Sequence, residues 1–146
     1  PMCSKFKWFM LPLLAALLGA SEPPDRDWSD LTVIGSGLGT ETFTYSQMSA
    51  YLHGNNLRWP NQKQVVLVLP SSDHPGAEKV ALAVYGKSVS QVKRYWLAQV
   101  FQGRATPPIY KDSNEEILKY VQKQQGAVGV LVSYNGSTEL SLELTD

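Results

Sequence analysis

The chain has 146 residues, of which 43% are hydrophobic and 18% are charged, and its acidic and basic side chains balance to a formal net charge of zero. This length favours one domain, and this composition is typical of a folded globular protein. The balanced charge argues against a nucleic-acid-binding protein, and no basic stripe stands out in the sequence.

The first 21 residues have the composition of a secretory signal peptide. Lys5 and Lys7 precede an apolar run that is shorter than the roughly 20 residues needed to span a bilayer. Small residues close the segment, so we expect cleavage before Glu22 or after Ala20, with a retained membrane anchor as the alternative. We therefore expect a periplasmic protein that contacts a membrane only through an uncleaved signal peptide.

The only cysteine of the chain, Cys3, lies inside the segment 1–21. The exported protein would then have no disulfide and no thiolate metal site, which suits the oxidising periplasm. Ser21 stands where a lipoprotein signal would carry its cysteine, so we expect a soluble protein with a net charge of −2 after cleavage. Residues 22–30 hold two prolines and four acidic side chains and are predicted to form a flexible lead-in.

Short apolar runs between turn residues predict five strands. These lie at residues 31–34, 65–69, 109–110 and 127–132 and, as alternating leucines, at 140–144. Gly129 is expected where another backbone approaches closely, and Asn135–Gly136 is typical of a hairpin turn. Alternation of these strands with helices predicts an α/β fold, a central mixed sheet flanked by helices, in one domain over residues 31–146.

Helix starts are marked by residues that cap the first turn. Three capping boxes pair Thr44 with Gln47, Ser88 with Gln91, and Ser113 with Glu116. A further helix is expected after Asp73, its predicted N-cap, through Val80 and Val84 to Gly86.

The helix that begins at Ser88 carries the largest apolar surface of the chain. Its apolar side chains follow a helical period: Val89, Val92, Tyr95, Trp96, Val100 and Phe101. Stripes of this kind are mostly buried, so we interpret it as core and expect the other elements to pack around this helix. Gly103 and then Pro107 and Pro108 end it.

A glycine-rich turn from Gly35 to Thr40 follows the first strand. Such a turn can bind an anion on its backbone N–H groups. However, the lysine of a phosphate-binding loop and the GxGxxG spacing are both missing. A flexible turn is the favoured interpretation and an anion site is the alternative.

No catalytic or metal-binding pattern is found, so neither an enzyme nor a cofactor is predicted. Ser71, Ser72, Asp73 and His74 have the residue types of a hydrolase triad, but consecutive side chains cannot converge as a triad requires. His53 is the only other histidine, and it lacks metal-ligand spacing to His74. Both histidines are expected at the surface or at helix ends.

One binding site remains as a hypothesis, at the turn after the strand 65–69. A helix N-terminus offers free N–H groups to an anion, and its dipole favours negative charge. Ser71 and Ser72 can donate hydrogen bonds, while Asp73 accepts and would recognise a protonated oxyanion. The alternative is that Asp73 simply caps the helix.

Four segments in order resemble the phosphate-binding proteins of bacterial ABC importers, in the type II periplasmic-binding-protein fold. They are residues 48–54 with Trp59, the strand and turn 65–76, the stretch 95–108, which resembles short single-lobe members, and Gly126–Val130. The match extends from about Leu31 to Tyr134. It implies a single-lobe α/β domain that binds phosphate or another small oxyanion in uptake or sensing.

Departures from the family pattern weaken that implication. The resemblance implies a site at Ser71, Ser72, Asp73 and Gly76, but the family's arginine is absent and Ala77 replaces its threonine. The first-lobe phosphate loop has no counterpart, and a two-lobed binder needs about twice this length. The resemblance thus implies weak binding, or binding helped by a protein partner or a second copy. The alternative is a ligand-free module that acts as an interaction protein in a periplasmic assembly.

Overall fold

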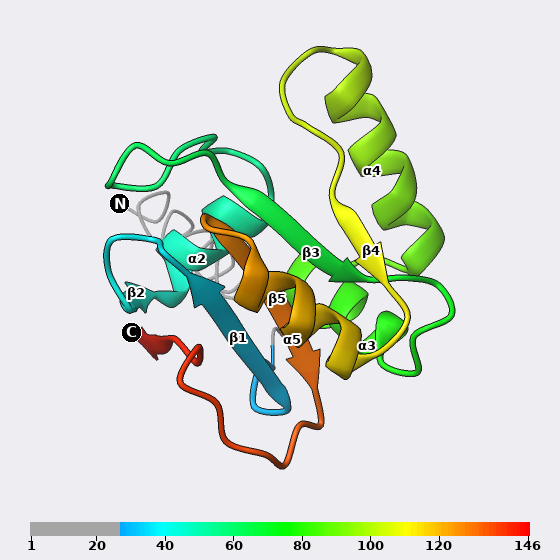
Figure 1. Ribbon diagram of the computed structural model, residues 1–146. Coiled ribbons are helices and arrows are strands. Elements are labelled where there is room, and N and C mark those ends of the chain that lie inside the picture. The colour runs from blue at the N-terminus through cyan, green and yellow to red at the C-terminus, as the bar shows by residue number, and fades with distance from the viewer. Residues whose placement is uncertain (1–26) are drawn as a thin grey trace, which may run out of the picture.

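The computed structural model describes residues 27–146, so the predicted signal peptide and residues 22–26 lie outside the described residues. The strands are β1 (Leu31–Ser36), β2 (Thr42–Thr44), β3 (Val66–Pro70), β4 (Ile109–Lys111), β5 (Ala127–Val132) and β6 (Glu143–Thr145). The helices are α2 (Tyr45–Leu52), α3 (Ala77–Val80), the π-helix η2 (Ala81–Tyr85), α4 (Val89–Phe101) and α5 (Asn114–Lys123). Their arrangement is shown in Figure 1.

A four-stranded mixed sheet with the order β1-β5-β3-β4 forms the centre of the molecule. β3 pairs in parallel with β4 and β5, whereas β1 runs antiparallel to β5. All six residues of β5 are buried, because a continuous apolar strand can be covered on both faces. The predicted α/β class and mixed sheet are confirmed.

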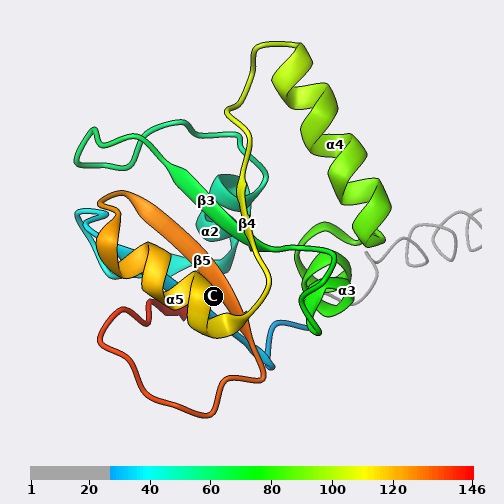
Figure 2. The same ribbon diagram turned by 45° about the vertical axis from the view of Figure 1, so that its right-hand side comes forward.

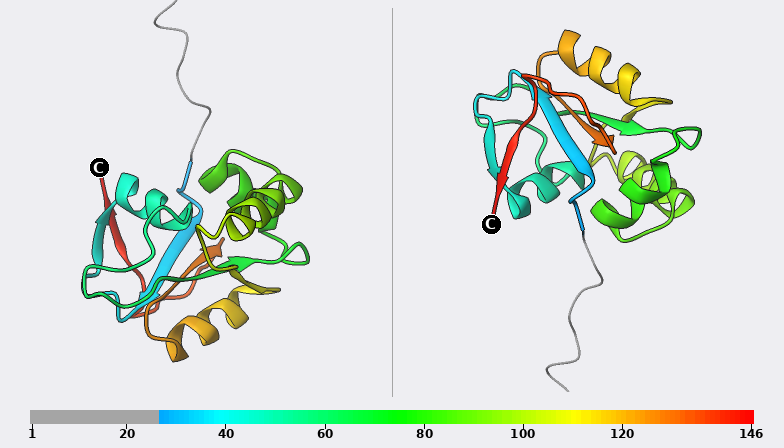
Figure 3. Two further views of the ribbon diagram at one scale, coloured as in Figure 1. Left: turned by 90° about the horizontal axis from the view of Figure 1, so that it is seen from above. Right: turned by 90° about the horizontal axis from the view of Figure 1, so that it is seen from below.

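Helices cover both faces of this sheet (Figure 3). α5 covers one face with Ile117 and Val121, which pack on Ile34, Val68 and Leu131. The other face carries the larger core, to which α2, α3, η2 and α4 contribute. Among residues 27–146, no helix has both the length and the apolar character required to cross a membrane.

Gly129 of β5 lies against side chains of α5. A Cβ atom at this position would lie 2.7 Å from Cγ2 of Ile117 and 3.0 Å from Cγ2 of Val121. Only a glycine leaves that space. The neighbours that come closest are side chains of α5, whereas the prediction is another backbone.

The expectation that the fold packs around α4 is wrong. Only Val92 and Trp96 of this helix are buried, while Leu97 is 59% exposed and Phe101 is 90% exposed. The sheet provides the centre instead, because β5 is apolar without interruption and takes covering layers on two sides. α4 lies at the periphery, and its end stands away from the sheet (Figure 2).

The expected hairpin at Asn135–Gly136 is also wrong. The chain after β5 passes along the outer side of β1, where the Leu142 amide donates to the Val33 carbonyl at 2.9 Å. It then pairs β6 in parallel with β2, in a separate two-stranded sheet. The final strand is accordingly shorter than the predicted 140–144 and begins at Glu143.

Two of the three predicted capping boxes are complete, at Thr44 and at Ser88. In the third, the Ser113 hydroxyl accepts from the Glu116 amide at 3.2 Å, but Glu116 accepts from the amide of Asp112 instead of that of Ser113. The box is therefore only half formed. The glutamate fixes the residue that follows β4.

Part of the predicted lead-in belongs to the folded core. Trp28 is 9% exposed, and its indole N–H donates to the carbonyl of Ala83 in η2 at 3.0 Å. Leu31 also donates its amide to the Trp28 carbonyl at 2.9 Å. Residues 27–30 are thus held in place, because a buried indole anchors them.

Candidate oxyanion-binding site

The predicted binding turn lies at the carboxyl end of the parallel strands. β3 ends at Pro70 next to Lys111 of β4, and the Ser71 amide donates to the Lys111 carbonyl at 2.8 Å. β5 runs parallel to β3, so Val132 lies at the same edge of the sheet. Open α/β sheets bind their ligands outside this edge. The glycine-rich turn after β1 lies at the opposite edge, since β1 is antiparallel to β5.

The hydroxyl of Ser71 is already engaged. It donates to the carboxylate of Asp112, which follows β4, and it accepts from the amide of Asp73 at 3.2 Å. The hydroxyl proton of Ser71 is therefore already used in a hydrogen bond to a carboxylate of the protein itself. Asp112 also brings a negative charge close to the predicted site, which the sequence did not indicate.

The amide of Gly76 is engaged as well, by His74. Nδ1 of His74 accepts from the Gly76 amide at 2.9 Å, so the ring proton lies on Nε2, which donates to Oδ1 of Asn114 at 3.0 Å. His74 is only 6% exposed. The expectation of a surface or helix-end histidine is wrong for His74, because its imidazole closes the turn from within.

Asp73 does not cap the helix that follows. The residue before α3 is Gly76, no side chain bonds to the first turn, and α3 itself has only four residues before η2 begins. Hydrogen bonds of the turn explain the shift, since the amide of His74 donates to the Ser71 carbonyl and that of Ala77 to the His74 carbonyl. Asp73 is left exposed at the surface of the turn.

Ser72 keeps an exposed hydroxyl and has a cation beside it. Nζ of Lys93, from α4, donates to Oγ of Ser72 at 3.1 Å. Sequence reasoning missed Lys93, because no local pattern indicates that α4 passes this turn. An exposed hydroxyl, an ammonium and the neighbouring carboxylate of Asp73 are the groups that this turn offers to a ligand.

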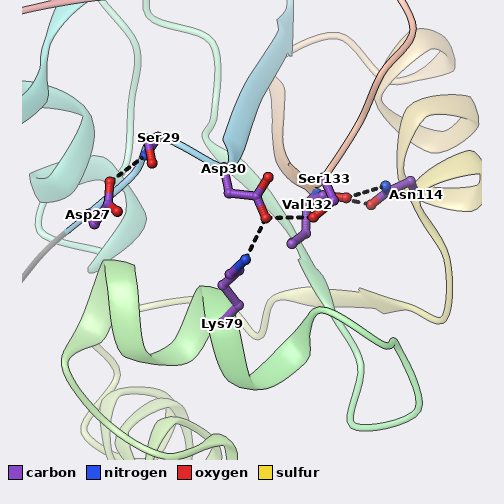
Figure 4. A network of polar contacts seen from close by, with 7 residues as sticks. All are labelled: Asp27, Ser29, Asp30, Lys79, Asn114, Val132 and Ser133. Carbon is purple, nitrogen blue, oxygen red and sulfur yellow. Dashed lines mark hydrogen bonds and ion pairs between the residues drawn. The ribbon is translucent and has the colours of Figure 1, made fainter.

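Asn114 at the start of α5 joins the turn to the sheet. Its side-chain amide donates to the Val132 carbonyl at 2.8 Å, and its oxygen accepts from the Val132 amide at 3.1 Å as well as from His74. Figure 4 shows this pair beside a second network at the same edge of the sheet. The turn is therefore positioned by a chain of bonds from β5 through Asn114 to His74.

Asp30 forms the second network at the beginning of β1. It accepts from Nζ of Lys79 in α3 at 2.6 Å and from the Ser133 hydroxyl at 2.5 Å. These hydrogen bonds, that of Lys79 first, hold the pKa of Asp30 below its ordinary value. The bond from Ser29 likewise lowers the pKa of Asp27.

The lowered pKa of Asp30 predicts a loss of stability in acid. Its contribution is complete above the unfolded-state pKa of about 4 and disappears as pH falls through the lower folded-state value. We expect Asp30→Asn to unfold in urea with a shallower dependence on pH below about pH 4 than the unaltered protein. Lys79→Met should reduce the slope in the same direction, and an unchanged slope in both variants would contradict this role.

His53 lies at the end of α2, as expected, and its Nδ1 is 2.7 Å from the Ser49 carbonyl oxygen. It belongs to a different element from His74, and the two do not form a common site. In the described part of the chain, no group of three or more His, Cys, Asp or Glu side chains is placed to hold a metal ion.

Comparisons with known proteins identify the fold. No family model and no curated protein matches the chain, but solved structures do. A phosphate ABC transporter substrate-binding protein from Clostridium perfringens, solved with bound phosphate, is similar over 79% of this chain and 44% of its own, with 13% identity and a TM-score of 0.57. An ABC-type phosphate transport receptor from Vibrio cholerae covers 79% of this chain and 46% of its own, with 14% identity and a TM-score of 0.55.

A third structure, PstS from Borrelia burgdorferi, covers 70% of this chain and 40% of its own, with 12% identity and a TM-score of 0.50. The chain thus spans less than half the length of these proteins. At such low identity the comparison is one of architecture. The chain has the α/β fold of a periplasmic-binding-protein lobe.

Proposed function

We propose that the protein binds hydrogen phosphate or a related oxyanion at the turn 71–76, in phosphate uptake or sensing in the periplasm. The observation that carries this proposal is the contact between Lys93 Nζ and Ser72 Oγ at 3.1 Å. It supplies a cation at the edge of the sheet where this class of fold binds ligands, in a chain that lacks the family's arginine. The phosphate transport proteins of similar fold support the choice of ligand.

The groups of the turn suit a protonated, tetrahedral anion. Ser72 and Lys93 donate hydrogen bonds to its oxygens. Asp73 accepts a hydrogen bond from an O–H group of the anion, and sulfate has no such O–H group near neutral pH. Ser71 and Gly76 contribute only if Asp112 and His74 release them. Binding by one open turn is therefore weak, with a dissociation constant on the order of 1 mM. A partner protein or a second copy would strengthen it by closing the site.

Titration with phosphate followed by amide NMR tests this proposal. The protein is expressed with its own N-terminal segment in a Gram-negative host and purified as the cell processes it. We expect saturable shifts at Ser72 and Asp73, and smaller effects of sulfate. Lys93→Gln should weaken binding at least tenfold because a charged hydrogen bond is lost, whereas Lys87→Gln, an exposed lysine outside the turn, should not.

The second candidate function is a ligand-free module that binds another protein in a periplasmic assembly. The internal bonds of Ser71 and Gly76 favour it, because the Ser71 hydroxyl and the Gly76 amide already donate to groups of the protein itself. Phosphate that leaves every amide of the turn unshifted at millimolar concentration would support this candidate. Equal binding by the unaltered protein and Lys93→Gln would instead move the site elsewhere.

The export that both candidates require is a separate proposal. Mass spectrometry of the purified protein should show an N-terminus at Ser21 or Glu22, as expected of a cleaved signal peptide. Recovery of the whole chain in the membrane fraction would instead support a retained anchor.

A further inference from the structure

The balanced net charge of the chain conceals a strong asymmetry. The segment from residue 79 to residue 111 holds six basic side chains and no acidic one. The basic residues are Lys79, Lys87, Lys93, Arg94, Arg104 and Lys111. Every acidic side chain of the described part lies outside this segment, so the segment has a net positive charge and the rest of the described chain a net negative one, although Asp30 pairs with Lys79. Such asymmetry orients a protein on a charged surface.

α4 lies within this cationic segment and exposes apolar side chains. Leu97 is 59% exposed, and Phe101, one turn further on, is 90% exposed. Arg94 precedes Leu97 by three residues, so the three share the outward face of the helix, opposite the buried Val92 and Trp96. No element of the described chain covers this face.

The position of α4 makes this face accessible. The helix lies to one side of the sheet, and its carboxyl end, with the loop leading to β4, forms the part of the described molecule that projects furthest from it (Figures 1 and 2). Phe101 is the last residue of α4, and the exposed Arg104 follows in the loop. The most exposed aromatic ring therefore lies at a protruding, cationic tip.

We infer that this tip docks on an anionic lipid bilayer. Its surface is defined by Arg94, Leu97, Phe101 and Arg104. An aromatic and a leucine side chain enter the interface of a bilayer, while neighbouring cations bind lipid phosphates. A second copy docking through the same face would bring the cations of both copies together without an acidic partner, because α4 has no acidic residue. Two apolar side chains on a convex tip also fall short of the roughly 800 Å² that each partner of a standard protein interface buries.

This inference is independent of the oxyanion site. Lys93 points to Ser72 on the body of the molecule, whereas Arg94 and Leu97 lie on the outward face of α4. The acidic remainder of the protein would face away from the negative lipid surface. Docking of this tip would therefore hold the protein in one orientation at a membrane.

Co-sedimentation with vesicles tests the inference. Vesicles of phosphatidylglycerol and phosphatidylcholine are compared with vesicles of phosphatidylcholine alone, at low and high salt. We expect partitioning to the anionic vesicles that falls with salt. Phe101→Ser should reduce it about tenfold through lost apolar burial, and Arg94→Gln and Arg104→Gln about fivefold each. Leu57→Ser, at a residue 51% exposed outside the cationic segment, is the matched control and should leave it unchanged.

All variants share one N-terminus, so a contribution from residues 1–26 is the same in each. Circular dichroism confirms that each surface variant is folded. Anionic vesicles that bind the unaltered protein and Phe101→Ser equally would overturn the inference, as would the absence of binding. Phe101→Trp gives a second readout, since insertion shifts the emission of the new indole to shorter wavelength on anionic vesicles only.

Discussion

Trp59→Ala is expected to lower the free energy of unfolding by roughly 3 to 5 kcal/mol, because it removes a large side chain from a packed core. Trp59 is 1% exposed, although it lies in the loop between α2 and β3. Its ring centroid is 4.1 Å from that of Tyr51 and 5.7 Å from that of Phe43. Its indole N–H donates to the Gly126 carbonyl at 2.8 Å, which fixes the loop to the start of β5.

A matched pair of variants separates the two contributions of Trp59. Trp59→Phe keeps an aromatic ring but leaves the Gly126 carbonyl with one bond fewer, so we expect a smaller loss of about 1 to 3 kcal/mol. Leu57→Ala in the same loop is an exposed control and should change stability by less than about 0.5 kcal/mol. Urea unfolding followed by circular dichroism measures all three. A cost for Trp59→Ala no larger than that for Leu57→Ala would contradict the described packing.

Asn114→Ala is expected to destabilise the protein by roughly 2 to 4 kcal/mol, because each buried polar group left without a partner costs about 1 to 3 kcal/mol. The substitution removes the partners of the Val132 amide, the Val132 carbonyl and His74 Nε2 together. It should also loosen the turn at Ser72. We therefore expect broadened amide resonances over 71–76 and weaker phosphate binding than in the unaltered protein.

Asn114→Asp is the control for shape. It keeps the size of the side chain and both acceptor contacts, but it has no amide to donate to the Val132 carbonyl. We expect an intermediate loss of stability and a less disturbed turn, because the carboxylate still accepts from His74. Sharp, unshifted resonances of the turn in Asn114→Ala would show that the Asn114–His74 link does not position it.

Features of this fold that depend on neighbouring residues could be predicted from the sequence. The capping boxes at Thr44 and Ser88 join residues three positions apart, and the uninterrupted apolar run of β5 permits little except a buried strand. The α/β class follows from the order of such elements. These local patterns are enough to predict the elements, because few other structures fit the same residues.

Features that depend on distant contacts could not be predicted. The helical spacing of α4 indicates an apolar face but not how much of it the sheet covers. It therefore predicts a buried Phe101, whereas this side chain is 90% exposed. His74 and Lys93 acquire their roles from Asn114 and Ser72, at 40 and 21 residues' separation. The sequence therefore predicts the turn after β3, and the oxyanion site at that turn stays a prediction. Which of its donors remain open to a ligand depends on those tertiary contacts.

The pairing of β2 with β6 has a consequence for how the chain reaches its native state. Thr42–Thr44 cannot pair until Glu143–Thr145 are available, and these residues lie about 100 positions later in the sequence. Contacts of such long range slow folding, because the entropy cost of closing a large loop comes before the strand pairing can stabilise the chain. A chain that emerges from a ribosome or a membrane channel N-terminus first therefore completes this structure only after its last strand is released. Until then the edge of β1 lacks the segment that bonds to it in the native fold. We expect the chain to be most open to aggregation and proteolysis during this time.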